Sequence, residues 1–175
     1  MMAKYLVTGA AGFIGSAVAR RLIQMGHEVT IIDNLTTGYV ENVPKGANFI
    51  KSESFDSNAY EKLKPIKFDA ILHIAGQSSG EISFDNPIYD LQSNTQSTLS
   101  ILKFARETGC NRVIYASTMS IYGKQPDAPV KEDAYCMPLS FYAVGKLASE
   151  HYLRIYQQYG INTTALRLFN VYGPG

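Results

Sequence analysis

A tyrosine and a lysine four residues apart are the first pair in this sequence that could perform acid–base chemistry. Tyr142 and Lys146 stand in the run Tyr-Ala-Val-Gly-Lys, and this spacing places two side chains on one face of a helix. A tyrosine phenol ordinarily titrates near pH ~10, and a nearby ammonium group favours the phenolate. We therefore expect Tyr142 to act as a general base. The pattern is loose in a chain with 12 tyrosines, so its meaning depends on the surrounding elements.

Thr118 is a third candidate because of its place after an apolar run. It directly follows Arg112–Ser117, which we predict to be a buried strand. Ligands of open parallel sheets bind at the carboxyl ends of strands, where a threonine hydroxyl can hold a substrate oxygen during proton transfer. His73 ends another predicted strand, and we expect it to be a packed or capped residue, because no further metal ligands accompany it. We predict no metal site.

A glycine pattern near the start of the chain indicates a phosphate-binding loop. Gly9, Gly12 and Gly15 follow the predicted strand Lys4–Thr8 and open a predicted helix. The first glycine suits a tight turn, the second a close approach of backbone to a pyrophosphate, and the third close packing of helix on sheet. The free N–H groups of the helix then face the phosphates. A purely structural glycine turn is the alternative.

Asp33 extends this pattern to a particular cofactor. It lies 18 positions after Gly15, at the end of the second predicted strand, close to the ~20 expected for an acid that binds the adenosine ribose. A carboxylate there repels a 2′-phosphate, and no arginine stands beside it, so NAD is favoured over NADP. A helix-capping aspartate is the alternative. The positive nicotinamide ring would favour the Tyr142 phenolate further.

Alternating apolar and amphipathic runs predict the elements that must position these residues. The expected strands are Lys4–Thr8, Glu28–Ile32, Asn48–Lys51, Asp69–Ile74, Arg112–Ser117 and Asn162–Phe169. The expected helices are Gly12–Gly26, Ser57–Lys64, Asn86–Thr108 and Ser140–Tyr159. Strands separated by crossovers indicate an α/β fold with a doubly wound parallel sheet. We predict a Rossmann domain over residues 1–175 with strand order 3-2-1-4-5-6.

Several motifs together resemble those of the extended short-chain dehydrogenases, in particular the NAD-dependent nucleotide-sugar epimerases of the UDP-glucose 4-epimerase type. The resemblance covers the whole chain in the family's order. The motifs are Gly9-x-x-Gly12-x-x-Gly15, Asp33-Asn34-Leu35, His73-Ile74-Ala75-Gly76, Asn94, Ser117-Thr118-Met119-Ser120-Ile121-Tyr122-Gly123, Tyr142-x-x-x-Lys146 and Arg167-x-Phe169-Asn170-x-Tyr172-Gly173-Pro174.

The resemblance implies a role for each matching position. Thr118, Tyr142 and Lys146 would be catalytic, the last two also contacting NAD. The backbone N–H groups of Phe13 and Ile14 would join the three glycines at the pyrophosphate. The remaining cofactor-binding positions would be Asp33 and Asn34 at the ribose, Glu53 at the adenine, Ala75 and Gly76 along the cleft, and Asn94, which orders the active-site backbone. Thr118 and Asn170 would contact the nucleotide-sugar. The implied reaction is transient oxidation of the sugar by bound NAD.

Departures from the family pattern narrow this expectation. Dehydratases of the family carry two acidic residues after the catalytic threonine, where this chain has Met119 and Ser120, so dehydration is disfavoured. The segment after Gly76 lacks the lysine that many bacterial epimerases have there, so the resemblance does not identify the sugar that is bound. Family members continue into a substrate domain that we expect to be absent here, so we expect little or no epimerase activity from these 175 residues.

The two long predicted helices also raise the question of partners. The resemblance implies a homodimer through these helices. A stripe at helical spacing, made of Tyr152, Ile155, Tyr156 and Tyr159, forms either core packing or part of that seam. The composition is 46% hydrophobic and 18% charged with a net charge of +1, which favours neither nucleic-acid nor membrane binding. Two cysteines without metal spacing indicate free thiols in the cytoplasm. Another oxidoreductase of the family and a non-catalytic NAD-binding or dimerisation module remain alternatives.

Overall fold

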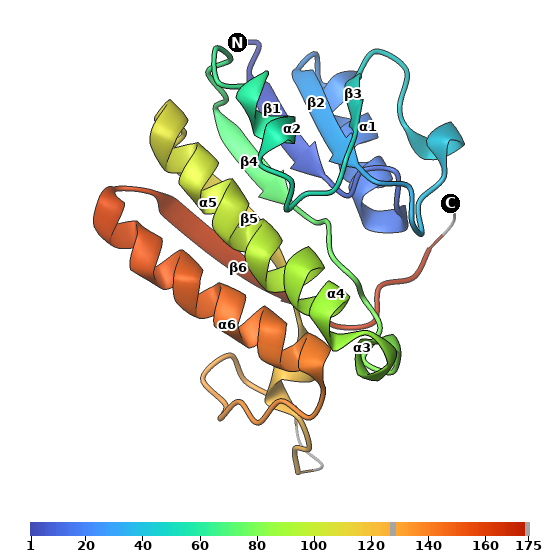
Figure 1. Cartoon of the computed structure of the whole chain (residues 1–175), viewed down its shortest axis with the longest axis vertical. Coiled ribbons are helices and arrows are strands. Elements are labelled where there is room, and N and C mark those ends of the chain that lie inside the picture. Colours follow the sequence, from blue (N-terminus) through green and yellow to red (C-terminus); the bar gives the residue numbers. More distant parts are fainter. Residues whose placement is uncertain (127–128, 174–175) are drawn as a thin grey trace.

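A parallel sheet forms the centre of the protein. The computed structural model describes residues 1–126 and 129–173, so Pro174 of the C-terminal motif lies outside the described residues. In this part of the chain six strands are ordered β3-β2-β1-β4-β5-β6 (Figure 1). Their bounds are β1 Lys4–Thr8, β2 Glu28–Asp33, β3 Asn48–Lys51, β4 Ala70–His73, β5 Arg112–Thr118 and β6 Asn162–Leu168. Every neighbouring pair is parallel, which confirms the predicted fold and strand order.

Helices cover the sheet from both sides. The helices α5 (Ser97–Thr108) and α6 (Phe141–Tyr156) lie side by side over β4, β5 and β6, and α1 (Phe13–Gln24) lies behind β1 and β2 (Figure 1). Shorter elements connect them. These are α2 Asn58–Glu61, α3 Ile82–Asp85, α4 Pro87–Leu91, the 3-10 turns η1 Val40–Asn42, η3 Met119–Tyr122 and η4 Gln157–Tyr159, and the π-helical turn η2 Gln92–Gln96.

The helix predictions differ from the structure at four places. The helix expected over 57–64 is regular only in α2, and α3 was not predicted at all. The helix expected over 86–108 is one helical run, but η2 interrupts its α-helical hydrogen bonding. The helix expected over 140–159 ends its regular part at Tyr156 and continues as η4. Within the described residues, no helix combines the length and apolarity needed to cross a membrane.

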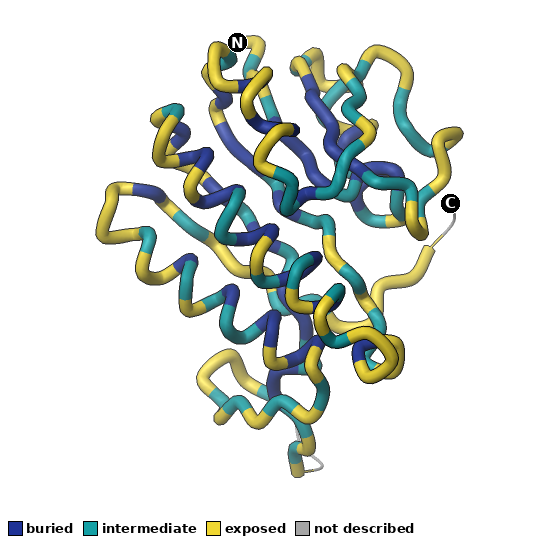
Figure 2. The backbone as a smooth tube through the Cα atoms, in the orientation of Figure 1, coloured by how far each residue is buried: buried dark blue, intermediate teal, exposed yellow. Residues whose placement is uncertain are grey.

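Two buried apolar clusters hold the layers together. One includes Leu6, Ile71 and Leu102 between the sheet and the α5–α6 side, and the other includes Val7 and Ile31 on the α1 side. Burial runs along the strands and the inward faces of the helices, whereas the described segment after β6 is exposed (Figure 2). Burial of this kind contributes about 25 cal/mol per Å² of apolar surface.

The stripe of Tyr152, Ile155, Tyr156 and Tyr159, which runs from α6 into η4, divides between the core and the surface. Tyr152 and Tyr156 pack against the first cluster, so core packing is confirmed for them. Ile155 is 48% exposed and Tyr159 is 52% exposed.

A buried histidine ties β1, β4 and α5 together at the edge where their functional loops begin. The Nδ1 atom of His73 lies 2.7 Å from the hydroxyl of Thr8, and its Nε2 atom lies 3.2 Å from the hydroxyl of Ser97. Burial, together with the charge of Lys146, lowers the pKa of His73 to about 3. The prediction of a packed histidine is therefore confirmed, and the ring is neutral at ordinary pH.

Candidate active site

The glycine loop lies at the carboxyl end of β1 and forms one wall of a cleft of about 550 Å³. Gly9 has φ +74°, and a Cβ atom there would lie 2.6 Å from the backbone nitrogen of Ala75. A Cβ atom on Gly15 would overlap the carbonyl oxygen of Gly9. On Gly12 it would meet nothing closer than that oxygen at 3.4 Å. Gly9 and Gly15 are therefore required by the close packing of the backbone around them. Gly12 instead leaves space open in the cleft, as a pyrophosphate-binding loop requires.

Asp33 ends β2 beside this loop and is only 7% exposed. One carboxylate oxygen accepts a hydrogen bond of 2.9 Å from the N–H of Ala11, and the other accepts 2.8 Å from Leu35. Leu35 has φ +63°, a conformation that non-glycine residues adopt at a cost and often at functional sites. No helix begins at Asp33, so the helix-capping alternative is wrong. The carboxylate faces the cleft with acceptor capacity left for ribose hydroxyls.

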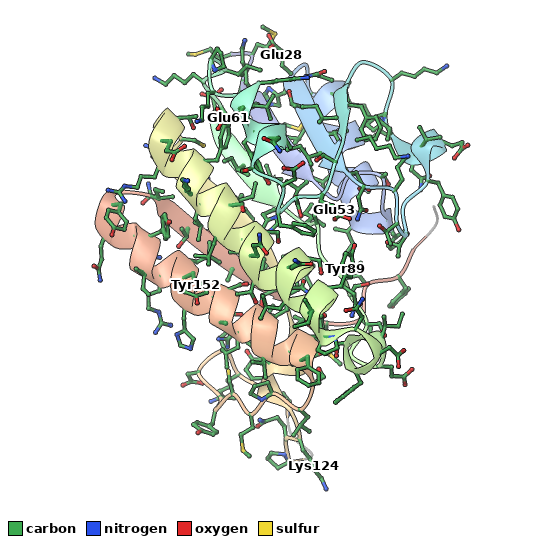
Figure 3. The ribbon with its side chains drawn as sticks, in the orientation of Figure 1. Glu28, Glu53, Glu61, Tyr89, Lys124 and Tyr152 are labelled. Carbon is green, nitrogen blue, oxygen red and sulfur yellow. The ribbon has the colours of Figure 1, made fainter. Side chains whose placement is uncertain are left out.

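Three polar side chains that line the cleft form a hydrogen-bonded bridge that the sequence did not predict. The amide nitrogen of Asn34 donates to a carboxylate oxygen of Glu53 at 2.9 Å and to the hydroxyl of Tyr89 at 3.1 Å. The amide oxygen of Asn34 accepts from Thr36 at 2.9 Å. Glu53 follows β3 and Tyr89 belongs to α4, and Figure 3 shows them as neighbours across the space between these elements. Asn34 and Glu53 thus line the cleft, and both N–H donors of the Asn34 amide are already used within the protein.

The middle of the cleft is formed by the segment after β4 and by η2. Ala75 and Gly76 line it, and a Cβ atom on Gly76 would overlap the amide oxygen of Asn94. Asn94 is fully buried in η2 and donates from its amide to the carbonyl of Gln77 at 3.0 Å and to Asp90 at 3.2 Å. The asparagine therefore holds the backbone after Gly76, and a π-helical turn at such a position is typical of functional sites.

The predicted catalytic residues converge at the carboxyl end of β5. Lys146 is 4% exposed and donates a hydrogen bond of 2.9 Å to the carbonyl of Ala116. Its ammonium nitrogen lies 4.7 Å from the ring centre of Tyr115 and 5.8 Å from that of Tyr142. Burial lowers the pKa of Lys146 to about 8, against the opposing effect of Asp90. Thr118 is buried and accepts a hydrogen bond of 3.1 Å from the N–H of Ser120.

The acidity of Tyr142 differs from the expectation. Burial raises the pKa of the Tyr142 phenol, and the interaction with the Thr118 hydroxyl lowers it by a smaller amount. The lysine four residues on does not produce a phenolate in the chain itself, because removal of the phenol from water has the larger effect.

Two further residues are placed unlike the sequence suggested. Asn170 is exposed in the segment after β6 and does not line the cleft. The lining of the cleft does not include Asn94, Thr118, Tyr142 or Lys146 either. Asp90 was not predicted, yet it is 1% exposed and accepts from the side chains of Gln77 at 3.1 Å and Asn94 at 3.2 Å. Burial raises the pKa of Asp90, and nearby Lys146 opposes this effect. The only sequence signal for Asp90 is its spacing of four residues from Asn94 on a helix.

A doubly wound sheet with a glycine loop after its first strand, and with a fifth strand that leads to Thr118 near Tyr142 and Lys146, is the architecture of the extended short-chain dehydrogenase class. Residues 5–175 match the NAD dependent epimerase/dehydratase family. The chain belongs to this family. The predicted family and its cofactor NAD are confirmed.

Relatives and solved structures agree with this assignment. The chain is 38% identical over 176 residues to UDP-glucose 4-epimerase of Mycolicibacterium smegmatis, covering 97% of this chain and 56% of that protein. It superimposes with a TM-score of 0.94 on Thermotoga maritima UDP-glucose 4-epimerase with UDP-glucose, at 35% identity, covering 98% of this chain and 57% of that one. The TM-score is 0.89 for the Thermus thermophilus enzyme in complex with NAD, at 38% identity and with coverages of 94% and 54%. The chain thus spans about half the length of these relatives.

Proposed function

We propose that the chain binds NAD and forms the cofactor half of a nucleotide-sugar epimerase of the UDP-glucose 4-epimerase type. The observation that carries the proposal is one continuous cleft, which runs from the glycine loop past Asp33 and Gly76. Its volume lies within the range of small-molecule sites, and the room above Gly12 fits a pyrophosphate. The wall at Asp33 favours NAD, because a carboxylate repels the 2′-phosphate of NADP.

The reaction that these residues support begins with proton removal from a sugar hydroxyl. Tyr142 takes this proton, Thr118 holds the sugar oxygen by a hydrogen bond, and Lys146 keeps positive charge beside the phenol. When bound, NAD supplies the hydride acceptor and donor. Met119 and Ser120 follow Thr118 and cannot eliminate water as paired acids do, which supports epimerisation over dehydration. Asn170 would contact the nucleotide-sugar only together with further chain.

The domain assignment is part of the proposal. Residues 1–175 would form the NAD-binding domain, and most of the nucleotide-sugar pocket would come from residues corresponding to the remainder of the longer relatives. On this proposal the 175 residues alone have little or no epimerase activity, although they bind NAD. Cys110 and Cys136 are free, which suits a reducing compartment such as the cytoplasm.

The outer surface of the helical layer supports a homodimer through the two long helices. Ile88 and Leu91 on α4 are 67% and 53% exposed, and Phe141 and Val144 on α6 are 49% and 53% exposed. Apolar residues gathered on one face are typical of an isologous interface. Val144→Glu should convert the dimer to a monomer in sedimentation equilibrium. An unchanged molecular mass for the variant, or a monomeric parent, would rule out this interface.

Calorimetric titration with NAD and with NADP tests the proposed function. We expect NAD to bind and NADP to bind at least about tenfold more weakly, a difference of about 1.4 kcal/mol. A result in which neither dinucleotide binds, to these residues or to a longer chain that contains them, would refute the proposal. If NAD binds, UDP-glucose and UDP-galactose are the substrates to try on the longer chain, with interconversion followed by chromatography.

A further inference from the structure

The bridge at the adenosine end of the cleft joins parts of the molecule that are distant in sequence. Asn34 follows β2 and Glu53 follows β3, both in the first half of the sheet, whereas Tyr89 belongs to α4. One amide nitrogen of Asn34 serves both partners, at 2.9 Å to Glu53 and 3.1 Å to Tyr89. Asn34, Glu53 and Tyr89 all line the same cleft as Asp33.

Tyr89 is held in place by the local sequence. Asn86 caps α4, because its side chain accepts the N–H of Tyr89 at 3.1 Å, and Pro87 occupies the first helical turn. Edge-on packing against Phe55, with ring centres 6.5 Å apart, fixes the aromatic ring. Tyr89 and Ser93 both line the cleft, as a spacing of four residues on a helix allows. Two anchors on its backbone and ring therefore aim the hydroxyl at Asn34.

We infer that Tyr89 is a cofactor-retaining residue, which closes the adenosine end of the cleft and slows release of the adenine-bearing half of the dinucleotide. The inference rests on the proposed binding of NAD. The ring of Tyr89 supplies an aromatic wall for the adenine, which would lie next to the ribose that Asp33 would bind. Its hydroxyl accepts a hydrogen bond from Asn34, which also donates to Glu53, and so it links α4 to the loops after β2 and β3. Slow release suits a protein whose reaction starts and ends with the same oxidation state of one bound dinucleotide.

Stopped-flow release of etheno-NAD, displaced by excess NAD, tests this inference because the fluorescent group is the adenine itself. Tyr89→Phe removes the hydroxyl bridge and should speed release about fivefold, as expected for one neutral hydrogen bond. Tyr89→Ala also removes the ring and should speed release more than about tenfold, as loss of an aromatic contact to a base does. Tyr159→Phe, on the exposed end of the helical layer, is the matched control and should release etheno-NAD as the parent does.

Ligands that carry half of the dinucleotide separate a specific role from a structural one. The affinity for ADP-ribose should fall in the Tyr89 variants, whereas that for nicotinamide mononucleotide, which lacks adenosine, should stay within about twofold. Equal loss for both half-ligands, or release rates within twofold of the parent in both variants, would overturn the inference while NAD binding stands. Failure of the parent to bind NAD at all would instead refute the proposed function and this inference with it. Tyr89→Phe keeps the ring and its packing, so it decides the role of the hydroxyl even if Tyr89→Ala does not fold.

Discussion

Replacement of Lys146 by methionine should stabilise the protein while removing a group of the candidate active site. Lys146 is 4% exposed, and burial lowers its pKa from 10.5 to about 8. Folding therefore disfavours the ammonium form, by about 3 kcal/mol at neutral pH. Methionine has similar length and no charge. The carbonyl of Ala116 loses its donor, which costs about 1 kcal/mol, so the expected net gain in the free energy of unfolding is about 2 kcal/mol.

The pH dependence identifies the cause of this gain. Because folding lowers the pKa of Lys146, the penalty is fully present below about pH 8 and disappears as the pH rises toward 10.5. The advantage of the methionine variant should therefore shrink by about 2 kcal/mol between pH 7 and pH 9.5, since the protein's other titrating groups cancel in the difference.

Urea denaturation followed by circular dichroism at the two pH values measures both quantities. Lys103→Met is the matched control, because Lys103 has a side chain that is 71% exposed and its loss should change the free energy of unfolding by less than about 0.5 kcal/mol at either pH. The reasoning is refuted if Lys146→Met is less stable than the parent at pH 7. It is equally refuted if the stability difference between variant and parent does not change with pH.

Three further predictions concern the cleft and its support. Gly12→Ala should weaken NAD binding at least about tenfold in calorimetry while the melting temperature stays within about 4 °C of the parent, because its Cβ meets only the Gly9 oxygen, at 3.4 Å. Gly15→Ala should instead abolish cooperative thermal unfolding, because its Cβ overlaps that oxygen. A Gly12 variant that binds NAD normally would contradict the cradle. Asp33→Ala should lower the affinity for NAD and so bring the NAD and NADP affinities within about threefold of each other. If the variant still preferred NAD as strongly as the parent, the carboxylate would not be the source of the preference. Since burial lowers the pKa of His73 to about 3, the free energy of unfolding should fall by about 2 kcal/mol between pH 7 and pH 5 because of this one histidine. The urea midpoint of His73→Asn should therefore change less over this pH range than that of the parent. An equal change in both proteins would contradict the neutral, buried histidine.

The sheet and the glycine loop were predictable because the demands on them are local. Apolar runs such as Lys4–Thr8 mark buried parallel strands, and right-handed crossovers leave few strand orders. Gly9 and Gly15 occupy backbone positions that admit no other residue, so their spacing in the sequence identifies the loop. Asp33 was predictable for a related reason, because the end of β2 always lies beside the first loop in this fold.

The rest of the site depends on contacts that no local pattern encodes. The π-helical turn is accompanied by extra hydrogen bonds to the carbonyl of Asn94, from the hydroxyl of Thr98 at 2.7 Å and of Ser149 at 3.3 Å. Ser149 comes from another helix, so sequence spacing in residues 86–108 could not reveal this turn. The bridge from Asn34 to Tyr89 likewise joins a loop to a helix 55 residues further along the chain. The burial that raises the pKa of Tyr142 likewise could not be predicted from the spacing between Tyr142 and Lys146.

Burial penalises the charged forms of Asp90 and Lys146, so other contacts must hold these side chains in place. Lys146 and Asp90 are both buried, and each partly offsets the burial penalty on the other's charge. The cost of removing these two charges from water can exceed their mutual attraction, so they stay buried only if the elements that carry them cannot move apart. Arg167 on β6 supplies such a tie, because it donates to both carboxylate oxygens of Glu150 on α6 at 2.8 to 3.2 Å.

The same tie continues to the strand that ends at Thr118. Glu150 also accepts a hydrogen bond of 2.6 Å from Ser117 on β5, and Arg167 donates at 2.9 Å to the hydroxyl of Tyr122 in η3. Charge-assisted, two-pronged pairs of this kind are geometrically specific and stronger than neutral hydrogen bonds. The network therefore fixes α6 against β5 and β6 one helical turn beyond Lys146, and it leaves the lysine little freedom to reach solvent. The stability contributed by these contacts, one helical turn from Lys146, is thus what allows a buried cation to remain near Tyr142.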